Sequence, residues 1–254
     1  MKTEVLKMAE KKTKKFVSAD SGKQTAAPAK KAKVVKEAAP VGNAKGLRIG
    51  AVVLWVLAIV MEVLALLVVI GKINLKFMPT LYQLIAFLVL DLAFVIIGAQ
   101  LWKKANRIDP VSEANKVKFW LWNNMGVIVC VVAFVPIIIL MLTNKELDKK
   151  TKSIAVVVAV IALLIGGVCS YDFNPVSEEQ QQAAISAVEG DVFWAPFGKV
   201  YHTHDDCQAL NQSDTLTYGT VEQAIAANRT RLCSFCAKND NITGVVTDGA
   251  AGGE

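Results

Sequence analysis

The sequence predicts an α-helical membrane protein with four transmembrane helices, followed by a small α+β zinc-binding domain at the C-terminus. Two observations carry this prediction. Four long apolar segments lie between Ile49 and Ser170, and three cysteines and two histidines gather in the last quarter of the 254 residues. We expect five parts along the chain: a disordered Lys/Ala-rich tail at 1–46, a transmembrane domain at 47–171, a linker at 172–189, a Cys/His metal-binding module at 190–238 and a flexible tail at 239–254.

The N-terminal tail is strongly basic. Residues 1–46 hold twelve lysines and four acidic residues, which gives a net charge of +8. The tail has few aliphatic side chains and cannot bury enough apolar surface to offset the entropy of ordering, so we expect it to be disordered. Its lysines suit anionic lipid or nucleic acid, and the alternative is a solvated arm that only fixes orientation during insertion. We expect no cleavable signal peptide, with Met8 as an alternative start to Met1.

The predicted membrane spans cover residues 49–70, 81–102, 119–143 and 154–170. A hydrocarbon core of about 30 Å needs roughly 20 helical residues, with about 17 as the lower limit, and all four segments meet it. The backbone must be helical there because lipid offers no hydrogen-bond partner to free N–H and C=O groups. The sequence therefore predicts a multi-pass protein of the cell membrane.

The distribution of Lys and Arg around the spans predicts that both termini are cytoplasmic. With the N-terminus inside, the inner flanks hold eleven of these residues and the outer loops hold six. The side that is richer in Lys and Arg is usually the cytoplasmic one. The fourth span disagrees locally, because four lysines precede it and acidic residues follow it. Taken alone, that span favours an outward C-terminus.

Two carboxyl groups fall inside the predicted spans. Glu62 lies about 21 Å along a helix from Arg48, and Asp91 lies about 18 Å before Lys103. The short connection between the first two spans makes their helices antiparallel neighbours, so we expect the carboxyls at similar depth near the midplane. Charge is costly at that depth. The pair is therefore either a proton or cation site, or a protonated pair that holds helices together.

The C-terminal module contains the most specific motif. Cys207 and the Cys-x-x-Cys pair of Cys233 and Cys236 supply three candidate ligands, and His202 or His204 supplies a fourth. Three thiolates and one imidazole are typical of a closed structural zinc site. A domain with one predicted hairpin and one short helix has little core of its own, so bound Zn2+ would contribute much of its stability.

Other interpretations of these residues are weaker. A Cys233–Cys236 disulfide leaves Cys207 unpaired and does not fit a reducing cytoplasm. A thioredoxin-like redox pair needs a βαβ context, and a Cys–His nucleophile needs an orienting third group; the sequence indicates neither. Zinc deaminases use His-x-Glu and Pro-Cys-x-x-Cys, which this sequence breaks at His202-Thr203-His204 and Leu232-Cys233. We therefore expect that the protein is not an enzyme.

The module also resembles a class of small Cys/His domains. The resemblance is carried by Val192-Phe193-Trp194, Gly198-Lys199-Val200-Tyr201-His202, Cys207, Leu210, Ser213, Gly219-Thr220, Ala224, Arg231 and Cys233-x-x-Cys236. Such modules occur at the ends of bacterial nucleases and of secreted or membrane proteins, and are similar in outline to the metal-binding domain of the Ada DNA-repair protein. The resemblance covers 190–238 and implies His202 as the ligand, with binding or stabilisation rather than catalysis. Ada-type domains use four cysteines, so the histidine argues against alkyl transfer.

Three functions follow as hypotheses. The first is a bacterial-type membrane protein whose cytoplasmic zinc module binds a cytosolic protein partner. The second is a small proton or cation transporter, or a channel subunit, that uses Glu62 and Asp91. A membrane-tethered enzyme is the weakest of the three, because no catalytic constellation is visible.

Overall fold

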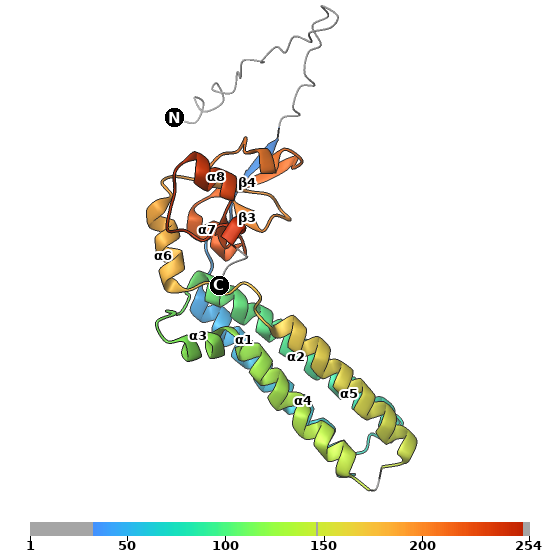
Figure 1. Ribbon diagram of the computed structural model, residues 1–254. Helices are drawn as coiled ribbons and strands as arrows, with labels where there is room; N and C mark the ends of the chain where they lie inside the picture. Colours follow the sequence, from blue (N-terminus) through green and yellow to red (C-terminus); the bar gives the residue numbers. More distant parts are fainter. Residues whose placement is uncertain (1–32, 146, 251–254) are drawn as a thin grey trace, which may run out of the picture.

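Four long helices form a bundle, and a small mixed module lies at one end of it (Figure 1). The computed structural model describes residues 33–145 and 147–250. The bundle helices are α1 (Ala44–Val69), α2 (Thr80–Ile108), α4 (Met125–Thr143) and α5 (Lys149–Ser170). Each is long and apolar enough to cross a membrane. The predicted fold class, four apolar helices followed by a small Cys/His module with a few strands, is confirmed.

The bundle is apolar on its outer surface as well as inside. Leu88 and Phe134 lie in its core and are at most 1% exposed, whereas Ile49 and Val168 on the outside are more than 60% exposed. Helices that are hydrophobic all round are stable when acyl chains or other apolar groups surround them. The outer surface therefore fits a lipid environment.

Glycines such as Gly98 and Gly166 allow the helices to approach closely. A Cβ at Gly98 of α2 would lie 2.5 Å from Nε1 of Trp55 on α1, and a Cβ at Gly166 of α5 would lie 2.7 Å from Sγ of Cys130 on α4. Small residues serve this role in membrane helices because packing, rather than the hydrophobic effect, drives their association. Gly167, the next residue, faces open space.

The third apolar segment differs from the prediction. The expected span at 119–143 is divided at Asn124 into a short helix, α3 (Lys116–Asn123), and α4. The side-chain amides of Asn123 and Asn124 donate to backbone oxygens one turn earlier, at 3.0 Å each. Nδ2 of Asn106 on α2 donates to Oδ1 of Asn123 at 3.2 Å. Asparagine side chains compete for backbone groups in this way and interrupt helices, and here they hold α3 against α2.

The other three spans have longer helices than the expected 49–70, 81–102 and 154–170. Helices α1 and α5 begin at residues 44 and 149, and α2 continues to residue 108. The starts of α1 and α5 are set by their N-caps, since the side chains of Asn43 and Asp148 accept hydrogen bonds from backbone amides in the first turn. These caps lie in the polar flanks, beyond the apolar residues that define a span.

The module contains seven regular elements that follow the bundle. They are α6 (Glu178–Ala187), β2 (Val192–Trp194), β3 (Val200–Tyr201), β4 (Thr215–Gly219), α7 (Val221–Ala226), β5 (Arg231–Leu232) and α8 (Ser234–Asn239). Two short 3-10 turns, η2 (Gln208–Leu210) and η3 (Asp248–Ala250), complete it. α6 occupies part of the expected linker at 172–189 and begins with a capping box between Ser177 and Gln180.

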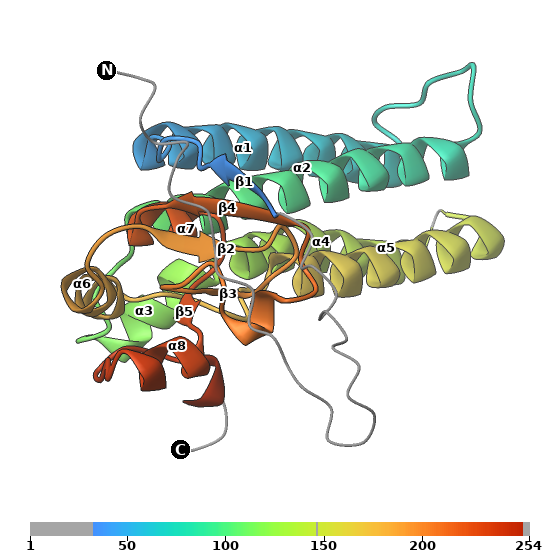
Figure 2. The ribbon, with the colours of Figure 1, turned by 90° about the horizontal axis from the view of Figure 1, so that it is seen from above.

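A strand from before the bundle completes the module. β1 (Val34–Glu37) pairs in parallel with β4, from Val34 opposite Thr215 to Glu37 opposite Tyr218, and the sheet order is β1-β4-β2 (Figure 2). The Lys33 ammonium also donates to the Asp205 carbonyl at 2.7 Å. The expected disorder at 1–46 therefore does not describe residues 33–46, because β4 offers backbone partners that the local sequence does not reveal. Residues 1–32 of that tail lie outside the described residues.

Part of the expected flexible tail at 239–254 also forms defined contacts with the module. Thr247 forms a bridge with Leu232 of β5, and Oδ1 of Asp248 accepts a hydrogen bond from the Ser234 amide at 2.7 Å. These contacts hold the segment around Thr247 and Asp248 against β5 and the start of α8. Residues 251–254 lie outside the described residues.

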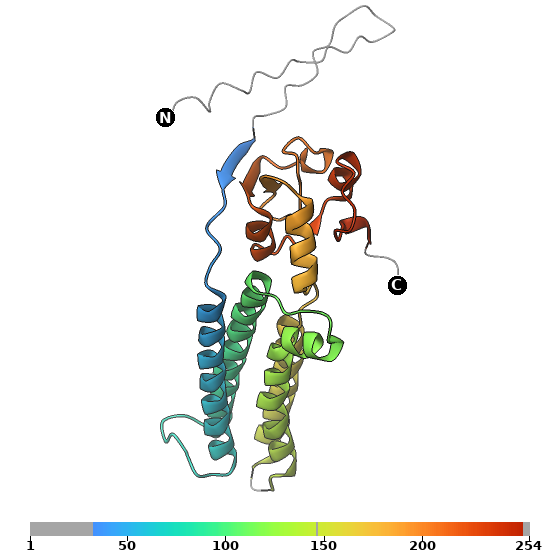
Figure 3. The same ribbon diagram turned by 90° about the vertical axis from the view of Figure 1, so that its left-hand side faces the viewer.

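Polar contacts join the module to the end of the bundle. The buried carboxylate of Asp172 lies 3.4 Å from Nη2 of Arg107 on α2, and the Glu178 amide donates to the Val111 carbonyl at 3.3 Å. Nζ of Lys103 donates to the Cys169 carbonyl at 2.8 Å, which satisfies the C-terminal end of α5. The strand before α1 and the module after α5 thus lie at the same end of the bundle (Figure 3).

Candidate metal centre

Two short parallel strands place the first two candidate ligands. β3 pairs with β5 so that Tyr201 lies opposite Leu232, and His202 and Cys233 directly follow these residues. The Cys233 amide donates to the Tyr201 carbonyl at 2.9 Å, and the amide and carbonyl of His202 each bond to Phe193 at 2.7 Å. Backbone hydrogen bonds therefore position both ligands, Cys233 through Tyr201 and His202 through Phe193.

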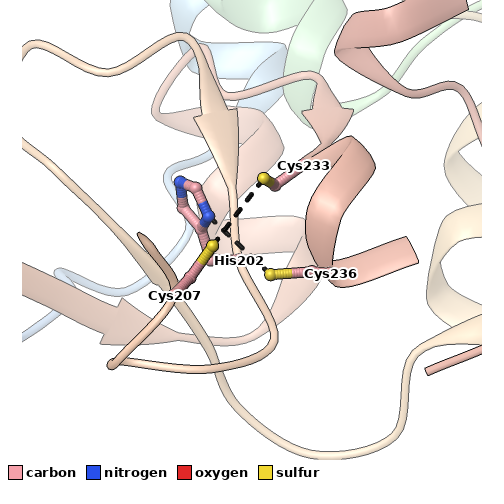
Figure 4. Close-up of side chains that lie close together, drawn as sticks. All are labelled: His202, Cys207, Cys233 and Cys236. Carbon is pink, nitrogen blue, oxygen red and sulfur yellow. Dashed lines mark hydrogen bonds between the residues drawn. The ribbon is translucent and has the colours of Figure 1, made fainter. Parts of the chain in front are cut away.

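The other two ligands come from a helix start and a turn. Cys233 is the N-cap of α8, which brings Cys236 back to the same side one turn later. Cys207 lies just before η2, where its carbonyl accepts a hydrogen bond from the Leu210 amide at 2.9 Å. Figure 4 shows that the four side chains converge on one point from these elements.

The spacing of the four ligand atoms suits a tetrahedral metal. One ligand atom from each of His202, Cys207, Cys233 and Cys236 lies within 4.8 Å of the others. Sγ of Cys207 is 3.9 Å from Sγ of Cys233, and Sγ of Cys236 is 3.8 Å from Nδ1 of His202. Zinc–sulfur and zinc–nitrogen bonds of ordinary length place such atoms about 3.8 Å and about 3.6 Å apart around a tetrahedral ion. The residues therefore fit a metal ion.

The three cysteine thiols have different pKa values. Burial raises the pKa of Cys207 to about 12, and the nearby sulfurs of Cys236 and Cys233 add to this rise. Burial likewise raises the pKa of Cys233. For Cys236 burial also acts upward, but hydrogen bonds from His202 and Thr203 outweigh it and lower the pKa to about 6. Burial and neighbouring sulfurs thus keep Cys207 and Cys233 protonated without a cation, and a bound metal ion would stabilise all three sulfurs as thiolates.

His204, the alternative ligand, lies outside this group. Its Nε2 is 2.7 Å from Oδ1 of Asp240, and its side chain is 46% exposed. The hydrogen bond to Asp240 raises the pKa of His204. Oδ2 of Asp240 also accepts a hydrogen bond from Oγ1 of Thr203 at 2.5 Å. Asp240 thus holds the segment that follows His202 in place. The sequence does not reveal this role, because Asp240 lies more than 30 positions after Thr203 and His204 and forms no motif with them.

The two intramembrane carboxyl groups lie far from the metal centre, within the bundle. Glu62 on α1 is 6% exposed and Asp91 on α2 is 1% exposed. Oε1 of Glu62 and both carboxyl oxygens of Asp91 have no hydrogen-bond partner among the described residues. The structure therefore buries both groups inside the bundle and leaves three of their four carboxyl oxygens without a partner among the described residues.

The fold and the site together define a class: a membrane protein with four spanning helices and an appended Cys/His module that can hold a metal ion. Comparisons of the chain with protein-family models, curated proteins and solved structures found no match.

Proposed function

We propose that this protein carries a structural zinc module on a membrane anchor and uses the module to bind a protein partner at the cytoplasmic surface. The convergence of His202, Cys207, Cys233 and Cys236 within 4.8 Å is the observation that carries the proposal. The resemblance to small Cys/His modules implies the same four residues, with His202, which follows Tyr201, as the fourth ligand.

The donor set favours zinc over other metals. Thiolates with one imidazole in a tetrahedron suit Zn2+, whereas Ca2+ and Mg2+ require oxygen ligands. Four protein ligands fill the coordination sphere, and a catalytic zinc would need an open position for water. The proposal is therefore a structural metal, and it assigns the module no catalysis.

Metal analysis of the purified full-length chain tests the zinc assignment. The whole chain is required because β1, which lies before the bundle, belongs to the module's sheet. We expect about one zinc per chain, lost in Cys233→Ser. Cys169→Ser is the matched control, since Cys169 lies in α5, and it should keep the metal. A chain without zinc, or equal zinc in both variants, would contradict the assignment.

The cytoplasmic placement is supported by charge and by redox chemistry. The flanks at the module's end of the bundle are the ones richer in Lys and Arg. The five cysteines are all free, and thiols stay reduced in the cytoplasm. Protease added to intact cells should therefore leave the module uncut and should cut it after lysis.

The tip of the hairpin between β2 and β3 is the best candidate for a partner contact. Phe197 is 99% exposed there, although large aromatic residues are usually buried. Arg229 donates to the carbonyls of Ala195 and Pro196 on the same tip, which fixes the backbone just before Phe197. Aromatic side chains are frequent anchors in protein interfaces.

Photo-crosslinking in native membranes tests this contact. A photoreactive residue at position 197 should form one defined adduct, and chelation of the metal should abolish it. The same residue at position 77, in the loop at the opposite end where Phe77 is 78% exposed, is the control and should not form that adduct. An adduct at 197 that survives chelation, or none at all, would contradict partner binding by a zinc-dependent module.

A second candidate function is supported by the buried carboxyls. Glu62 and Asp91 lie in the apolar bundle with three unsatisfied oxygens between them, and such groups in membrane proteins often carry protons or cations. Proton flux into liposomes should then fall in Glu62→Gln and Asp91→Asn and stay unchanged in Glu113→Gln, an exposed control. Flux that is absent, or equal in all variants, removes the transport function.

A further inference from the structure

The short helix α3 has two sharply different faces. At 3.6 residues per turn, Val117, Trp120 and Leu121 share one side of the helix. They are 69%, 51% and 41% exposed. This exposed side is apolar, although α3 lies at the polar end of the bundle.

The opposite side of α3 is fixed to the bundle. Nε1 of Trp102 on α2 donates to the Trp122 carbonyl at 2.8 Å, and the rings of these two residues are 5.1 Å apart. Asn123 is buried and bonds to Asn106 at 3.2 Å. The exposed face is therefore held in one orientation by α2 and does not turn inward to bury its apolar side chains.

Two lysines lie at the borders between these faces. Lys116 and Lys118 are both exposed, and the helical period puts them on either side of the apolar face. Lysines at these positions can extend their ammonium groups toward headgroups while their stems cover apolar surface. This arrangement is typical of helices that lie in the surface of a membrane.

The position of α3 next to a span suits this face to the surface of a bilayer. A single residue, Asn124, separates α3 from the membrane-spanning helix α4. α3 lies across the axis of the bundle instead of continuing along it (Figures 1 and 3). Tryptophan prefers this depth because its ring is apolar and its N–H needs a polar partner.

We propose that α3 is an interfacial helix: Val117, Trp120 and Leu121 insert between acyl chains just below the headgroups, and Lys116 and Lys118 bind the phosphates of anionic lipids. The lipid surface is continuous with the outer surface of α4, where Val131, Val132 and Ile139 are exposed. Binding there fixes the depth of the module's end of the bundle in the membrane.

Fluorescence quenching in vesicles tests the depth of Trp120. The full-length protein and Trp120→Phe are placed in phosphatidylcholine brominated either near the headgroup or near the chain end, and the difference between their emissions isolates Trp120. This emission should be quenched more strongly by the shallow bromines than by the deep ones. Trp194→Phe, in the module, is the control and should remove an emission that neither lipid quenches.

Two other outcomes would overturn the proposal. Quenching of Trp120 by iodide in water, without quenching by lipid, would mean that the face is solvated. Protection from both quenchers would mean that protein covers it, as in a contact between two copies of the chain. Metal content of each variant checks that the module has folded.

The role of the lysines is tested separately with spin-labelled lipid. The double variant Lys116→Gln/Lys118→Gln should lose the preference of boundary lipid for phosphatidylglycerol over phosphatidylcholine. The matched variant Lys149→Gln/Lys150→Gln makes the same charge change at the start of α5, at the other end of the bundle, and should keep the preference. An equal effect of both double variants, or no effect of the first, would contradict headgroup binding by α3.

Discussion

The amide of Cys233 donates a hydrogen bond to the carbonyl of Tyr201 at 2.9 Å. This bond continues the register of the parallel pair β3–β5 by one residue, and it places Cys233 beside His202. Two ligands that are 31 positions apart in the sequence are thus brought together by backbone geometry. The metal centre is built on a pair of strands of only two residues each, so bound metal and strand pairing should stabilise each other.

The two histidines should respond differently to mutation. His202→Ala removes a ligand whose Nδ1 is 3.8 Å from the Cys236 sulfur, so zinc content should fall to near zero or the affinity should drop by several orders of magnitude. His204→Ala removes only the exposed contact to Asp240 and should keep one zinc. Metal analysis of both variants in parallel is the measurement. Zinc retained in the first and lost in the second would reverse the assignment.

Zinc affinity should rise with pH. The pKa of Cys207 is about 12 and that of Cys233 is also raised, whereas that of Cys236 is lowered to about 6. Near neutral pH, zinc must therefore displace protons from Cys207 and Cys233 but not from Cys236. The apparent affinity should increase by about two log units per pH unit there and fall away more steeply as the pH drops below the pKa of Cys236. Competition with a chelating dye measures this; an affinity independent of pH would contradict it.

The pairing of β1 with β4 can be tested with two proline variants. The Ala38 amide donates to the Tyr218 carbonyl at 2.8 Å, so Ala38→Pro should cost about 1 kcal/mol of module stability. Val35 is the matched control, because alternation along the strand turns its amide away from β4, and edge strands accept proline there. Hydrogen exchange of the β4 amides should increase in Ala38→Pro only. The same increase in both variants would mean that this pairing does not hold the strand.

Adjacent glycines in α5 should differ in their tolerance of alanine. A Cβ at Gly166 would meet the Cys130 sulfur at 2.7 Å, while one at Gly167 would meet nothing within 4 Å. Gly166→Ala should therefore destabilise the bundle by about 1–3 kcal/mol. Gly167→Ala should be neutral or stabilising by up to about 1 kcal/mol, because alanine favours helix. Thermal unfolding in detergent compares the two, and an equal loss in both would mean that α4 and α5 do not pack as described.

The prediction from sequence was wrong at the start of the third span, at the polar end of the bundle. Hydropathy alone extends the third span back to Phe119, because Trp120, Leu121 and Trp122 are apolar. The helix nevertheless ends at Asn123, since Asn106 on α2 supplies a partner for the Asn123 side chain. The hydropathy of the third span contains no information about a hydrogen-bond partner on another helix.

The sequence by itself determined the four apolar helices and the candidate ligands, with His202 and His204 as alternatives, because both depend on local properties: the length of an apolar run, and the donor atoms of cysteine and histidine. Only the tertiary structure decided that His202 joins the cysteines while His204 bonds to Asp240, that β1 belongs to the module, and that α3 leaves the third span. Each of these depends on backbone or side-chain partners that are distant along the chain, and the free energy of such contacts is fixed by geometry that no short window of residues contains.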